Sequence, residues 1–97
     1  MEISIQDICQ FATQKTKEAK SEEYREKYGQ STIVLFRVGD FWEAYGECAA
    51  DLARATGVTL SIQNGMKLAA FPKRSEDVYF PKLVREGFKV ALVDENI

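Results

Sequence analysis

Apolar and polar positions along the chain predict a mixed β-sheet with helices packed on it. Residues 31–38 form an almost unbroken apolar run, which is typical of an interior strand covered on both faces. Residues 58–62 alternate as a half-buried strand does, and a Gln-Asn-Gly segment at residues 63–65 predicts a tight hairpin turn to a returning strand over residues 66–71. The apolar run over residues 88–93 predicts the last strand.

Helical spacing and capping residues predict the helices between these strands. One helix begins at about Ile5, and a second begins at Ser21, which can cap it, and ends before Gly29. A third begins at Asp40, where Glu43 three residues later completes a capping box, and it runs to about residue 56.

A fourth helix is expected over residues 76–86, kinked or split at Pro81, because proline removes a backbone donor and clashes with the preceding turn. The predicted order is α-α-β-α-β-β-α-β, an α/β (α+β) fold. The hairpin must be antiparallel, and the β-α-β connections favour parallel pairing. We expect a single domain, with residues 1–20 as an extra N-terminal helix and residues 21–97 as the main module.

The composition excludes several classes of function. The 97 residues suffice for one hydrophobic core, and the absence of histidine excludes Ser-His-Asp triads, histidine metal ligands and imidazole acid–base catalysis. The sequence has no glycine-rich phosphate loop, and its two cysteines, Cys9 and Cys48, lack the CxxC spacing of a metal site. We therefore expect a protein that is not an enzyme and that needs no cofactor or metal.

The charge distribution argues against a protein that binds nucleic acid unaided. A net charge of -2 and a pI near 5.2 lack the basic footprint that such proteins share. Residues 67–89 carry more basic than acidic side chains, which would fit a mildly basic face or simply a mixed solvated surface. No apolar run is long enough to cross a bilayer and no signal peptide is recognisable, so we expect a cytoplasmic protein without a membrane partner.

Two segments resemble a known family. FRVGDFWEAYGECAADLARATGVTLS, at residues 36–61, is similar to the signature of the N-terminal mismatch-recognition domain, domain I, of the MutS family of DNA mismatch-repair proteins. FPKRSEDVYFPKLVREGFKVALVDEN, at residues 71–96, resembles the family's later stretch, in which a proline-containing turn leads into a helix and a last strand. The resemblance covers about residues 24–96 and implies the MutS domain I fold.

The family's Phe-x-Glu motif falls by position on Phe41 and Glu43. The resemblance implies that Phe41 wedges into a duplex at a mispaired base and that Glu43 hydrogen-bonds that base. Such a wedge costs a few kcal/mol of unstacking per step, and least at a mismatch, where stacking is already weak. Trp42 is the next candidate for stacking on a base, although it would equally serve in packing.

Three basic residues are weaker candidates for contacts to DNA phosphates: Arg37, Lys73 and Arg74. The implied partners are double-stranded DNA, mismatched or distorted, and further domains of a longer parent chain. That parent would be a mismatch-repair ATPase or another enzyme that handles DNA.

The residues alone leave a second interpretation open. Glu43 is required by the predicted capping box and Phe41 begins an apolar helix face, so both side chains would then serve folding only. The chain would be a protein-interaction or structural domain that keeps the fold, with Phe41 packed inward and an acidic surface facing a protein partner. Exposure of the Phe41 side chain separates the two interpretations, because a wedge must protrude.

Overall fold

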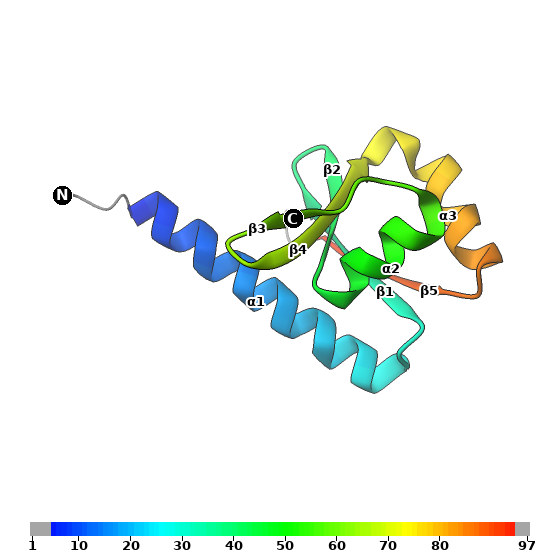
Figure 1. The fold of residues 1–97 in the computed structure, drawn as a ribbon, viewed down its shortest axis with the longest axis horizontal. Coiled ribbons are helices and arrows are strands. Elements are labelled where there is room, and N and C mark those ends of the chain that lie inside the picture. The colour runs from blue at the N-terminus through cyan, green and yellow to red at the C-terminus, as the bar shows by residue number, and fades with distance from the viewer. Residues whose placement is uncertain (1–4, 95–97) are drawn as a thin grey trace.

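The computed structural model describes residues 5–94, with side chains from residue 16 onward. Figure 1 shows a long N-terminal helix beside a small sheet and two shorter helices. The elements in chain order are α1 (Ile5–Tyr28), β1 (Thr32–Val38), β2 (Phe41–Tyr45), α2 (Glu47–Thr56), β3 (Ser61–Gln63), β4 (Met66–Pro72), a 3-10 turn (Lys73–Ser75), α3 (Glu76–Arg85) and β5 (Lys89–Val93).

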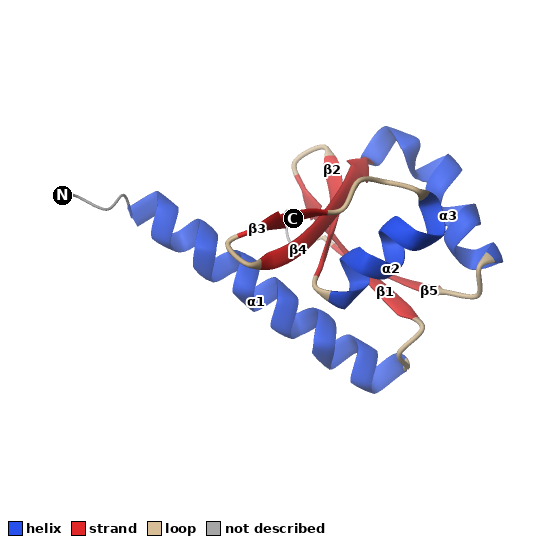
Figure 2. Ribbon diagram, viewed as in Figure 1, coloured by secondary structure: helices blue, strands red, loops and turns tan. Residues whose placement is uncertain are grey.

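Five strands form one mixed sheet in the order β3-β4-β2-β1-β5 (Figure 2). β5 pairs with β1 in parallel, and the other neighbouring strands are antiparallel. β1 has a partner on each side, and residues 32–36 of this strand are buried, as the unbroken apolar run predicts. The mixed sheet with helices packed on it confirms the predicted α+β class.

The largest difference from the sequence prediction lies directly after β1. The segment predicted to start a helix at Asp40 is instead the strand β2, and the helix begins only at Glu47. Gly39 and Gly46 bracket β2 with φ angles of 61° and 67°, a region that glycine enters at little cost. The capping box is therefore wrong, because Glu43 lies within the β-sheet and helix α2 starts after it.

The two predicted N-terminal helices are one continuous helix, α1. Ser21 does not cap a new helix, because its hydroxyl donates to the carbonyl of Lys17 at 2.9 Å, one turn back along the same helix. Gly29 follows the last helical residue with a φ of 112°, as predicted. The division at residues 20 and 21 falls inside α1 and stays a prediction, and residues 1–4 lie outside the described part.

The hairpin between β3 and β4 is confirmed. Asn64 and Gly65 have φ angles of 54° and 76°, as a two-residue turn between antiparallel strands requires. β3 is shorter than predicted and spans only Ser61–Gln63. α3 is not split at Pro81, which lies inside the helix, and β5 matches the last predicted strand.

The side chains of β2 alternate between the two faces of the sheet. Helices pack on this sheet, and both α1 and α2 contact β2 (Figure 1). Tyr45 faces α1, whose Lys17 Nζ lies 5.8 Å from the centre of the Tyr45 ring. Trp42 faces the opposite side, where the ring of Phe80 from α3 lies 6.1 Å away between ring centres. α2 contacts α3 on this second side. The hydrophobic core therefore lies on both faces of the sheet.

A buried ion pair joins α1 to α2. Arg25 Nη2 lies 3.0 Å from Asp51 Oδ2, and the two side chains are 9% and 10% exposed. Arg25 also donates to the carbonyl of Gln30, just before β1. Arg54 reaches the other oxygen of Asp51 from the surface at 2.5 Å. This network fixes the end of α1 against the middle of α2.

Candidate nucleic-acid interface

Phe41 and Glu43 lie on the same face of β2, because side chains two positions apart on a strand point to the same side. In the register with β4, Phe41 lies opposite Pro72 and Glu43 lies opposite Ala70. The spacing of the Phe-x-Glu motif is thus the spacing of a strand. A helix would have turned the two side chains about 200° apart.

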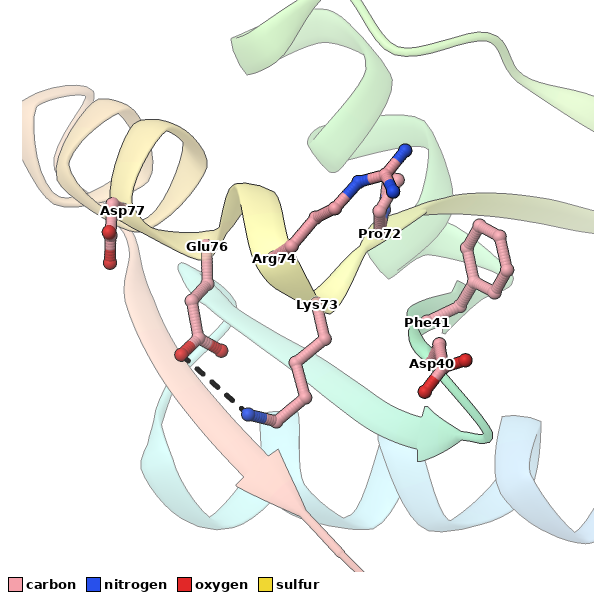
Figure 3. Close-up of a pocket in the computed structure, with 7 residues that line it drawn as sticks. All are labelled: Asp40, Phe41, Pro72, Lys73, Arg74, Glu76 and Asp77. Atoms are coloured by element: carbon pink, nitrogen blue, oxygen red, sulfur yellow. Dashed lines mark ion pairs between the residues drawn. The ribbon is translucent and has the colours of Figure 1, made fainter.

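Phe41 protrudes from the sheet and is 46% exposed, although β2 has neighbours on both sides. It borders a hollow of about 540 Å³ at the junction of β2, β4 and α3, lined by Asp40, Phe41, Pro72, Lys73, Arg74, Glu76 and Asp77 (Figure 3). The backbone N–H of Lys73 donates to the Asp40 carbonyl at 2.8 Å and holds the two sides of this hollow together.

Glu43 is half-buried and accepts a hydrogen bond at Oε1 from the hydroxyl of Tyr45, the next residue on the same face of β2. Tyr45 is 2% exposed. Burial raises the pKa of the Tyr45 hydroxyl, and the hydrogen bond to Glu43 and the negative charge of that residue raise it further. Tyr45 therefore stays a protonated donor toward Glu43. Tyr45 was not among the predicted site residues, because the helical prediction for this segment separated it from Glu43.

Trp42 lies on the opposite face from Phe41 and is 4% exposed. Its indole N–H donates to Glu76 Oε2 at 2.9 Å, which satisfies the buried polar group. The burial favours the packing role for Trp42. Glu76, which the sequence prediction did not single out, links this strand to the first turn of α3.

The three predicted cations occupy different positions. Lys73 and Arg74 both line the hollow beside Phe41, but Lys73 turns toward Glu76, with Nζ 3.9 Å from Oε1, whereas Arg74 extends away from that pair (Figure 3). Arg37 lies opposite Trp42 in the register, hence on the other face of the sheet, and its Nη1 pairs with Asp94 Oδ2 at 3.1 Å. Only Lys73 and Arg74 are brought near Phe41.

The described side chains contain no group of three or more Cys, Asp or Glu residues suited to a metal ion. Cys48 is a buried free thiol whose sulfur accepts from the backbone N–H of Val34 at 3.5 Å, and the side chain of Cys9 lies outside the described part. Burial raises the pKa of the Cys48 thiol. Within residues 5–94, none of the helices has the length and apolarity that crossing a bilayer requires.

The fold and the site define a small α+β domain that presents an aromatic ring and a carboxylate side by side on a central strand. The family model for MutS domain I matches residues 14–96. The chain belongs to the MutS domain I family.

Relatives that carry the name DNA mismatch repair protein MutS match the same region. The chain is similar to the protein of Cytophaga hutchinsonii, 44% identical over 68 residues, which cover 65% of this chain and 8% of the relative. The protein of Porphyromonas gingivalis is 46% identical over 68 residues, with the same coverage of 65% and 8%. The protein of Flavobacterium psychrophilum is 35% identical over 91 residues, which cover 82% of this chain and 10% of the relative. The match thus spans about a tenth or less of each relative's length.

Proposed function

We propose that this domain is a non-enzymatic module that probes double-stranded DNA for mismatched or distorted sites. Phe41 acts as the wedge and Glu43 hydrogen-bonds the displaced base. The observation that carries the proposal is the 46% exposure of Phe41 on the face that it shares with Glu43. An apolar ring held out from a paired strand contributes little to a core but can stack into a weakened base step.

Lys73 and Arg74 supply phosphate contacts beside the wedge in this proposal. Both line the hollow at Phe41, and Arg74 is exposed. We leave Trp42 and Arg37 out of the contact set, because both lie on the other face of the sheet. Two cations on a chain of net charge -2 give weak phosphate binding, so further domains of a longer DNA-processing protein supply most of the affinity.

The alternative of a protein-interaction or structural domain required Phe41 to pack inward. The exposed ring supports DNA probing instead.

The proposal is tested by fluorescence anisotropy with matched, mismatched and bulged duplexes at low salt, on the longest natural form of the protein that carries this domain. We expect the wild type to bind the distorted duplexes more tightly than the matched duplex. Phe41→Ala should lower this affinity ratio roughly tenfold, since stacking a base on an aromatic side chain is worth about 1–3 kcal/mol.

Leu92→Ala is the matched control. The exposed fraction of Leu92 is 49%, similar to the 46% of Phe41, but Leu92 lies on the opposite face of the sheet, on the edge strand β5. It should leave the preference unchanged. A wild type without any preference, or a folded Phe41→Ala that keeps the wild-type preference, contradicts the proposed function.

A further inference from the structure

We propose that Tyr45 is a positioning residue that orients the Glu43 carboxylate toward the DNA; this inference rests on the proposed function. The hydroxyl of Tyr45 donates to Oε1 of Glu43, two positions away on the same face of β2. The donor and the acceptor therefore belong to one strand, whose extended backbone sets the distance between their Cα atoms. Glu43 is paired with both β1 and β4, and Tyr45 is paired with Leu68 of β4.

The ring of Tyr45 is held from several sides. It packs edge-on against Phe36 of β1, with 5.8 Å between ring centres and an interplanar angle of 64°. From α1, Lys17 Nζ lies 5.8 Å from the centre of the Tyr45 ring and 6.0 Å from that of Phe36. With 2% of its surface exposed, the ring cannot swing away. The hydroxyl at its tip is a donor fixed in place.

Glu43 gains from such a donor because its own side chain is long and only half-buried. A free glutamate samples several rotamers, and ordering them on binding lowers the affinity for a ligand. A hydrogen bond that already holds one carboxylate oxygen removes much of this cost before DNA arrives. The carboxylate beside Phe41 is then pre-oriented.

A purely structural role makes a different prediction. If Glu43 only satisfied the buried hydroxyl of Tyr45, loss of that hydroxyl would change the stability of the domain but leave its choice between duplexes untouched. If Tyr45 acts through Glu43, the loss changes the choice between duplexes, and it does so only while Glu43 is present. A double-mutant cycle separates these two cases.

The test measures the preference for mismatched over matched duplex by fluorescence anisotropy for wild type, Tyr45→Phe, Glu43→Ala and the double variant, using the longest natural form of the protein. Tyr79→Phe is the matched control, because Tyr79 of α3 packs on Phe71 at 4.6 Å between ring centres, away from the Phe41 face. Urea unfolding of each variant verifies that it is folded, which is expected since Phe keeps the packed ring.

We expect Tyr45→Phe to lower the preference roughly three- to tenfold, as loss of one hydrogen bond does, with little change in affinity for matched duplex. In the Glu43→Ala background, Tyr45→Phe should change the preference by less than roughly twofold. An unchanged or increased preference in Tyr45→Phe, or equal effects in both backgrounds, overturns the positioning role alone. A wild type without preference overturns the proposed function, and this inference with it.

Discussion

Trp42 donates its indole N–H to Glu76, with 2.9 Å between Nε1 and Oε2, and this bond ties the strand that bears Phe41 to the first turn of α3. Glu76 also lies 3.9 Å from Lys73 Nζ through its other oxygen. One carboxylate therefore joins a buried ring to a cation of the hollow. Removal of the Glu76 carboxylate should weaken the packing between β2 and α3 behind the hollow at Phe41.

We expect Glu76→Ala to lower the free energy of unfolding by about 1–2 kcal/mol, because the buried indole N–H loses its acceptor. Asp77→Ala is the control, since Asp77 occupies the same first helical turn but is exposed. It loses only a favourable charge at the helix N-terminus, worth about 0.3–1 kcal/mol. Urea unfolding followed by circular dichroism measures both variants, and equal losses would contradict the role of the Trp42 bond.

Asp51→Ala should destabilise the domain far more than Arg54→Ala, although Arg25 and Arg54 both contact Asp51. Asp51→Ala leaves the charge of Arg25 buried without its partner, which costs about 3–5 kcal/mol. Arg54 is 73% exposed, so its contact is worth at most about 0.5 kcal/mol. Thermal unfolding of the two variants compares these losses. A large decrease in the unfolding temperature of Arg54→Ala would show that the Arg54–Asp51 contact stabilises the domain more than the exposure of Arg54 indicates.

The unfolding free energy should fall as the pH rises above about 10, the ordinary value for tyrosine, partly because of Tyr45. Burial, with a contribution from Glu43, raises the pKa of Tyr45 in the folded protein. As the pH rises, the unfolded chain therefore loses the Tyr45 proton before the folded protein does. The stabilising contribution of protonated Tyr45 is complete below pH 10 and is lost as the pH increases.

Tyr45→Phe should flatten this alkaline decline. Urea unfolding of wild type and variant between pH 8 and about pH 11 isolates the contribution, because the other titrating groups are common to both proteins. Parallel curves for the two proteins would contradict the assignment.

Arg74→Ala should weaken binding to matched and mismatched duplexes alike, and it should lower the slope of log K against log salt by about 1, as loss of one phosphate contact does. Arg85→Ala is the control, since Arg85 is exposed in the last turn of α3, outside the hollow at Phe41. Anisotropy titrations at several salt concentrations give the slopes. A selective loss for mismatched duplex would instead assign Arg74 to base recognition.

The sequence was sufficient to predict the interior strand, the Asn64-Gly65 hairpin and the last strand, because each depends on a local signal: an unbroken apolar run, a turn dipeptide or a bounded β-type run. It was not sufficient for β2. Its apolar residues satisfy helical spacing as well as strand alternation, and a short segment cannot distinguish the two. Gly46, whose φ of 67° separates β2 from α2, is the signal that marks the boundary.

The sequence proposed residues for the site but did not predict how they are arranged. Phe41 and Glu43 were paired by the family motif, whereas their shared face follows only from the strand. Tyr45 was missed because this segment was predicted to be a helix, in which Tyr45 and Glu43 do not share a face, whereas a strand places residues two positions apart on the same side. Glu76 was missed because its contact with Trp42 joins β2 to α3, and a contact between distant elements leaves no periodic pattern in the sequence.

The strand that carries Phe41 and Glu43 is held by a ladder on each side, with β1 on one edge and β4 on the other. A strand in that position opens only when a larger part of the sheet opens with it, so it behaves as a stiff support. A ligand pressed against the Phe41 ring meets a surface that does not yield. Under the proposed function the duplex therefore carries the deformation, and duplexes should be ranked by how easily they bend.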